Sequence, residues 1–132
     1  MTSDYSHTNL SEVKDSAADF GHGDVMSVRF AGEAVDARDT GFSYHRIEPG
    51  RRQPFGHRHE QAEEVYVVIR GDGRINLDGE LVELRELDAV RVGPQVARCI
   101  EAGEGGIEFL AFGPRRQGDG EMLPGWWGED GA

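Results

Sequence analysis

Short runs of alternating apolar and polar residues recur along most of this 132-residue chain. From about position 25 onward, each run is rich in β-branched or aromatic residues and is bounded by Gly, Pro or Asp. This spacing, without any long stretch of helical periodicity, predicts an all-β domain. The expected strands are residues 25–31, 41–48, 55–59, 64–70, 74–77, 80–85, 89–92, 97–102 and 107–112.

Glycine-rich turn signals separate the expected strands. Asp78-Gly79 favours a tight hairpin turn, because both residues tolerate the positive φ that such a turn requires. The segments 71–73 and 103–106 are also interpreted as turns, each joining two separate strands. Strands that follow one another through short turns predict a sandwich or a small barrel.

Polar segments flank the predicted β domain on both sides. We predict an N-terminal arm over residues 1–23, loosely ordered, a barrel over 24–113 and a C-terminal tail over 114–132. The tail contains Trp126 and Trp127, whose large apolar rings favour burial. We expect them to cover a barrel edge or a subunit interface; the alternative is a lid over a ligand.

The composition limits which partners the protein can bind and indicates its cellular compartment. The chain has 14 basic and 25 acidic residues and a net charge of -11, which repels phosphate backbones and anionic lipid surfaces. We therefore expect no nucleic-acid and no membrane partner. The single cysteine, Cys99, cannot form an intrachain disulfide and predicts a cytoplasmic protein. Neither a signal peptide nor a membrane span is expected.

Candidate chemistry is concentrated just after position 56. His57 and His59 are two residues apart on one expected strand, so their side chains share a face. Glu64 begins the next strand and shares its face with Tyr66, whose hydroxyl is a candidate substrate-binding group; simple packing of the ring is the alternative. If the short link reverses the chain, Glu64 returns beside both histidines. Two imidazoles and one carboxylate suit Fe(II) and, nearly as well, Mn, Ni, Co or Zn.

Three further residues could contribute to this site, two of them as alternative metal ligands. Glu63 is a second carboxylate, but strand alternation points it away from the histidines. His45, on the preceding strand, is either a replacement ligand or an ordinary polar residue. Cys99 is expected to be a buried, unreactive thiol.

Two segments carry a resemblance to a known family. The first, EPGRRQPFGHRHEQAEEVYVVIRG, resembles the first motif of the cupins, in which H-x-H is followed by a glutamate and a glycine. The second, LDAVRVGPQVAR, resembles the second cupin motif. The resemblance covers roughly Phe42 to Phe112. It implies a jelly-roll barrel, the double-stranded β-helix, a small-molecule ligand and, as in many small single-domain cupins, a homodimer.

The second motif departs from the family pattern at two positions. Leu87 stands where cupins usually have glycine, and Arg98 stands where they have a fourth metal-binding histidine. A guanidinium stays protonated and offers only donors, so Arg98 cannot ligate a metal. It either pairs with Glu64 and disfavours a metal, or binds a substrate carboxylate beside a metal held by His57, His59 and Glu64.

Two functions follow from these alternatives. One is a metal-dependent enzyme on a small organic acid, such as a dioxygenase or an isomerase, in which Arg98 orients the acid. The other is a non-catalytic ligand-binding or sensing protein with a degenerate metal site. The residues do not decide whether the chain is an enzyme, and no catalytic residue is assigned.

Overall fold

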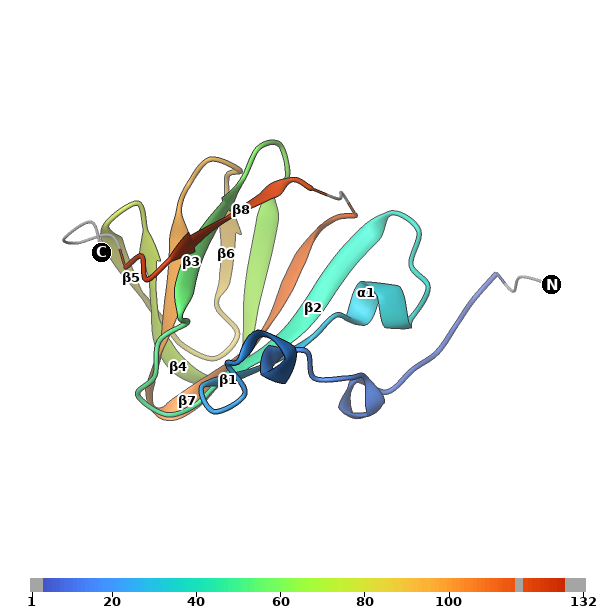
Figure 1. Cartoon of the computed structure of the whole chain (residues 1–132), viewed down its shortest axis with the longest axis horizontal. Helices are drawn as coiled ribbons and strands as arrows, with labels where there is room; N and C mark the ends of the chain where they lie inside the picture. Colours follow the sequence, from blue (N-terminus) through green and yellow to red (C-terminus); the bar gives the residue numbers. More distant parts are fainter. Residues whose placement is uncertain (1–3, 116–117, 128–132) are drawn as a thin grey trace.

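The computed structural model describes residues 4–115 and 118–127 (Figure 1). Nearly all of its regular structure is β-strand, as the sequence pattern predicts. The strands are β1 Met26–Arg29, β2 Thr40–Ile47, β3 Phe55–His59, β4 Glu64–Leu77, β5 Glu80–Leu84, β6 Ala89–Val92, β7 Arg98–Pro114 and β8 Gly120–Pro124. Three short helical elements precede or follow β1, namely η1 Leu10–Glu12, η2 Ala17–Phe20 and α1 Ala31–Ala34.

The strands form one antiparallel sheet that curls into a jelly-roll barrel (Figure 1). Its strand order is β1-β2-β7-β3-β8, and β4 pairs with β5, β6 and β7. The predicted all-β jelly roll is therefore confirmed. Side chains on the inner face form the core, among them Ile47, Val68, Ile75, Ile100 and Phe109.

Two predicted turns are wrong, because residues 71–73 and 103–106 lie inside the long strands β4 and β7. The glycines serve close backbone approach instead of chain reversal. A Cβ on Gly71 would collide with the carbonyl oxygen of Gly106, and one on Gly73 with that of Glu101. The register of β4 against β7 also shifts between Gly71 and Gly73, which marks a β-bulge. The tight turn predicted at Asp78-Gly79 is present, with positive φ at both residues.

The C-terminal strand β8 was not predicted, since its sequence GEMLP has no alternating pattern. It pairs with β3 along the whole length of that strand, from Phe55 opposite Pro124 to His59 opposite Gly120. Beyond β8, Trp127 is buried under the guanidinium of Arg52, whose carbon lies 3.9 Å from the ring centroid. The tail thus covers the barrel, as one interpretation of the tryptophans expects.

The N-terminal segment is anchored to the barrel through β1. The carboxylate of Asp15 accepts hydrogen bonds from the backbone of Ala17 at 3.1 Å and Val28 at 3.0 Å. Ser16 donates its backbone N–H to the Val28 carbonyl at 2.7 Å. The boundaries at residues 23 and 113 stay a prediction. Residues 1–3 of the expected arm, and 116–117 and 128–132 of the expected tail, lie outside the described residues.

Cys99 is fully buried on β7, as predicted. Burial raises the pKa of its thiol to about 12, so the reactive thiolate is suppressed. Among the described residues, no helix is long and apolar enough to cross a membrane.

Candidate metal centre

The three predicted metal ligands meet inside the barrel. His57 and His59 project from β3, and the link over residues 60–63 returns the chain so that Glu64 begins β4 beside them. The Oε1 atom of Glu64 lies 3.1 Å from His57 Nε2 and 3.3 Å from His59 Nε2. One donor atom from each residue falls within 4.8 Å of the others. This spacing places all three around a single point.

Tyr66 completes the polar cluster on β4. Its hydroxyl donates to Glu64 Oε1 at 2.9 Å and lies 3.4 Å from His57 Nε2. The side chain is buried, and burial together with the charge of Glu64 raises its pKa well above the usual value. Tyr66 therefore stays protonated and acts as a donor at neutral pH. Its alternation with Glu64 and Val68 on the inner face follows the predicted pattern.

Glu64 is a carboxylate at neutral pH although it is largely buried. Burial alone would raise its pKa, but the contacts with His57 and His59 outweigh burial and hold the pKa well below its usual range. The ionised carboxylate is the form that binds metal.

The donor set fits a divalent metal. Both ring nitrogens of His59 are buried without a hydrogen-bond partner among the described residues, although Nε2 lies only 3.3 Å from Glu64. A buried polar atom without a partner costs free energy, which a metal bound at Nε2 would offset. Two imidazoles and one carboxylate also leave coordination positions open for a ligand.

Arg98 lies at the same site but is held mainly by backbone. Its side chain is fully buried, and Nη1 donates to the carbonyls of Val96 at 2.9 Å and Pro94 at 3.3 Å. Its Nη2 atom lies 3.5 Å from Glu64 Oε1. This ion pair matches the first interpretation of Arg98. Substrate binding by Arg98 and by Tyr66 stays a prediction.

Glu63 and His45, the two alternative metal ligands, point in opposite directions relative to the barrel core. Glu63 points outward and pairs with Arg91 at 3.4 Å, with both side chains exposed. His45 instead points inward, where its Nε2 lies 2.7 Å from the hydroxyl of Ser43. Its ring stacks on that of Phe109, with 4.8 Å between the ring centroids. Within the described part of the chain, these contacts are those of a packed polar residue.

His45 is expected to make stability depend on pH. Burial lowers its pKa to about 4, below the value near 6.5 of an unfolded chain. The unfolded state therefore binds more protons between these values, so stability is lost as pH falls from about 6.5 to 4, by at most about 1.4 kcal/mol per pH unit.

Urea unfolding of the metal-free protein between pH 4.5 and 7.5 measures this slope. A His45→Gln variant keeps a polar group near Ser43 but cannot titrate, so its slope should be shallower over the same window. Equal slopes in the two proteins would show that His45 does not contribute.

Asp119 also belongs to this site, and sequence reasoning missed it. Its buried carboxylate lies just before β8, with Oδ2 3.4 Å from His59 Nδ1. It accepts hydrogen bonds from the backbone of Gln61 at 3.1 Å and Ala62 at 2.9 Å. No signal near Asp119 could have shown this, because it is one of several acids in a glycine-rich tail and reaches the site only when β8 pairs with β3.

A groove leads to Glu64 from the outside. It has a volume of about 690 Å³ and is lined by Phe42, Ser43, Arg38 and Arg115 as well as Glu64. Arg115 donates to the carbonyl of Ala37 at 2.6 Å, whereas the side chain of Arg38 is exposed. The groove is large enough for a small organic molecule.

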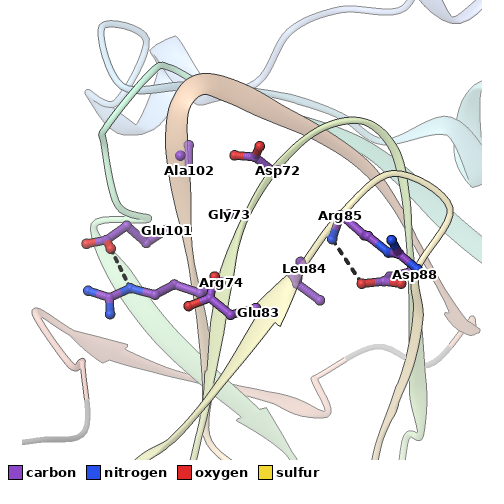
Figure 2. A pocket seen from close by; sticks show the side chains of 10 residues that line it. Asp72, Gly73, Arg74, Glu83, Leu84, Arg85, Asp88, Glu101 and Ala102 are labelled. Atoms are coloured by element: carbon purple, nitrogen blue, oxygen red, sulfur yellow. Dashed lines mark hydrogen bonds and ion pairs between the residues drawn. The ribbon is translucent and has the colours of Figure 1, made fainter.

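A second hollow, of about 610 Å³, lies away from the centre along β4, β5 and β7 (Figure 2). Its lining contains no histidine, and several of its charged side chains are bonded to neighbouring residues of the lining. Arg74 pairs with Glu101 at 2.8 Å, and the backbone of Arg85 donates to Asp88 at 2.9 Å. These contacts are typical of a solvated surface. The cluster of His57, His59 and Glu64 is therefore the better candidate for the functional site.

The family model for the cupin domain matches residues 43–111. No match was found among curated proteins. Solved structures resemble the whole chain. A cupin protein from Bacteroides fragilis is 25% identical, with a TM-score of 0.69 over 99% of this chain and 98% of that one.

Two further structures show the same fold at lower identity. The polyketide cyclase RemF from Streptomyces resistomycificus is 17% identical, with a TM-score of 0.73 over 99% of this chain and 90% of that one. A variant of Streptomyces PAC13 with uridine is 15% identical, with a TM-score of 0.69 over 93% of this chain and 92% of that one.

Proposed function

This chain belongs to the cupin family, and on that premise we propose that it binds a divalent metal through His57, His59 and Glu64 and a small organic ligand beside it. The observation that carries the proposal is the convergence of both histidine Nε2 atoms on Glu64 Oε1, at 3.1 and 3.3 Å. The donor set suits Fe, Mn, Ni, Co or Zn.

The groove beside Glu64 supports a small acid as the ligand. Arg38 and Arg115 line it together with the acids Glu33 and Glu64. Arg115 pairs with Glu33 at 3.8 Å, so the exposed Arg38 is the main charge that would attract an anion. Phe42 supplies an apolar wall. The structurally similar PAC13 variant was solved with uridine, a ligand of compatible size for a groove of about 690 Å³.

A metal-dependent enzyme is the first form of this function. A bound divalent ion would polarise an oxygen of the ligand and orient it. The residues of this chain would supply the rest: Tyr66 donates a hydrogen bond at the edge of the site, and the barrel wall limits access of water. Several neighbours of this fold have the names of enzymes, including the cyclase from Streptomyces resistomycificus.

A metal-free, ligand-binding cupin is the second candidate. The ion pair between Arg98 and Glu64 favours it, because a fixed positive charge 3.5 Å from the carboxylate opposes a dication at the same oxygen. In that case the cluster would bind or sense a ligand without chemistry. The homodimer and the cytoplasmic location stay predictions for either candidate.

Metal content decides between the two. We expect protein purified without added metal to contain close to one equivalent of a divalent ion by mass spectrometry. We also expect Fe(II), Mn, Ni, Co or Zn to raise the melting temperature of chelator-treated protein. Less than about a tenth of an equivalent, with no thermal shift, would contradict the metal and leave the second candidate.

A further inference from the structure

We propose that Asp119 is a positioning residue of the metal centre, which holds the His59 ring so that its Nε2 is available to the metal. This inference rests on the proposed function and deepens it. It concerns a residue outside both cupin-like segments, on the stretch of chain that leads into β8.

The His59 ring lies between two carboxylates. Its Nε2 is 3.3 Å from Glu64 Oε1, and its Nδ1 is 3.4 Å from Asp119 Oδ2. At these distances neither contact has the geometry of a formed hydrogen bond, and both nitrogens are buried. Each nitrogen nevertheless faces a separate carboxylate, Glu64 on the Nε2 side and Asp119 on the Nδ1 side.

Asp119 is itself held in place before any metal binds. Its side chain is 5% exposed. The carboxylate accepts from the backbone N–H groups of Gln61 and Ala62, and its own carbonyl accepts from the backbone of Glu60 at 3.0 Å. These bonds join the β8 end of the chain to the link between His59 and Glu64. The link is therefore braced at the point where it connects two ligands.

The chemistry of imidazole explains what this carboxylate does. A neutral histidine carries one proton, on either Nδ1 or Nε2. An acceptor beside Nδ1 favours the tautomer with the proton there, which leaves the Nε2 lone pair free. Histidine ligands of metals usually have such a partner on the other nitrogen. Asp119 acts through His59 and does not touch the metal.

An Asp119→Asn variant removes the negative charge beside Nδ1. Asparagine keeps one carbonyl oxygen, which accepts one of the two backbone N–H groups that bond to the carboxylate oxygens. Asp78→Asn is the matched control, because Asp78 also accepts a backbone N–H, from Ala97 at 2.8 Å, and contacts no residue of the centre. Should Asp119→Asn fail to fold, Asp119→Ser provides a smaller uncharged acceptor.

Two measurements are made on each protein. Long-range proton–nitrogen NMR of metal-free protein reports the His59 tautomer, with the signals assigned by a His59→Gln variant. Because Glu64 faces Nε2 as Asp119 faces Nδ1, the expected result is a difference: the Nδ1-protonated form should have a larger share in the unmodified protein than in Asp119→Asn. Competition titration with Zn²⁺ should show affinity about 10- to 100-fold weaker in Asp119→Asn. Neither quantity should change in Asp78→Asn.

The outcomes separate this inference from the proposed function. An unchanged tautomer together with Zn²⁺ affinity within about twofold of the unmodified protein would overturn the role of Asp119. An equal loss of Zn²⁺ affinity in Asp78→Asn would also overturn it, because the effect would then be general loosening. A tautomer shift in a protein that binds no metal would support positioning by Asp119 and contradict the metal function.

Discussion

Replacing His57 and His59 together by alanine is expected to weaken binding of a divalent metal by more than about 100-fold. This exceeds the loss of metal affinity, about 10- to 100-fold, that follows when a residue contacting a metal ligand is replaced. Only Glu64 would remain of the three converging donors, and one carboxylate holds a divalent ion weakly in water. The metal-dependent rise in melting temperature should disappear, since a ligand stabilises a protein only at concentrations above its dissociation constant.

The matched control removes two histidines elsewhere. A His7→Ala, His22→Ala variant loses the same number of imidazoles, both far from Glu64 in the sequence and absent from the cluster of candidate ligands. It should keep the metal response of the unmodified protein. Thermal shift and competition titration with Zn²⁺ measure both variants. Equal metal responses in the two double variants would show that the metal binds elsewhere and would remove the proposed centre.

Replacing Arg98 by methionine is expected to lower the free energy of unfolding of metal-free protein by about 3 kcal/mol. The guanidinium is fully buried, bonds to carbonyls of Val96 and Pro94, and pairs with Glu64. Its removal takes the guanidinium donor from the Val96 carbonyl and the charge partner from Glu64, whereas the Pro94 carbonyl keeps the backbone N–H of His59 at 2.7 Å. The loss is limited because Arg98 Nε and Nη2 have no hydrogen-bond partner among the described residues. The melting temperature should fall by roughly 10 °C.

Arg91→Met provides the comparison for an exposed arginine. Arg91 pairs with Glu63 at 3.4 Å on the surface, where such pairs contribute about 0–1 kcal/mol. Chemical unfolding of both variants at pH 7 in chelator measures the difference. Equal losses would show that the buried ion pair with Glu64 contributes no more than a surface pair.

The Arg98→Met variant also bears on the two candidate functions. Removing a positive charge 3.5 Å from Glu64 should strengthen metal binding, because the repulsion between guanidinium and dication is lost. Metal binding that appears only in this variant would identify the unmodified protein as a metal-free cupin. Metal binding in both proteins agrees with the first candidate.

Leu87, which stands where the second cupin motif usually has glycine, has an unusual backbone conformation. It has a φ of +72° and is exposed. Glycine adopts this left-handed conformation without strain, whereas leucine does so at a cost. The usual glycine of the second motif therefore serves the backbone here, and its loss does not alter the donor set of the centre.

Local sequence patterns determined the β class, most strand positions and the core of the site. Alternation in β4 places Glu64, Tyr66 and Val68 on one face because successive side chains of a strand point to opposite sides. The same rule puts His57 and His59 together and turns Glu63 outward. These are relations between residues only a few positions apart, so they can be derived without knowing which strands pair.

Tertiary structure decided everything that depends on strands meeting across the chain. Gly71 and Gly73 resemble turn residues in the sequence, yet they lie within β4. Glycine is needed there because the backbone of β7 passes too close for a side chain. Asp119 reaches His59 only because β8 pairs with β3. Arg98 lies beside the centre because β3 and β7 pair with His57 opposite Arg98. Such contacts join residues up to about sixty positions apart, and no local pattern encodes them.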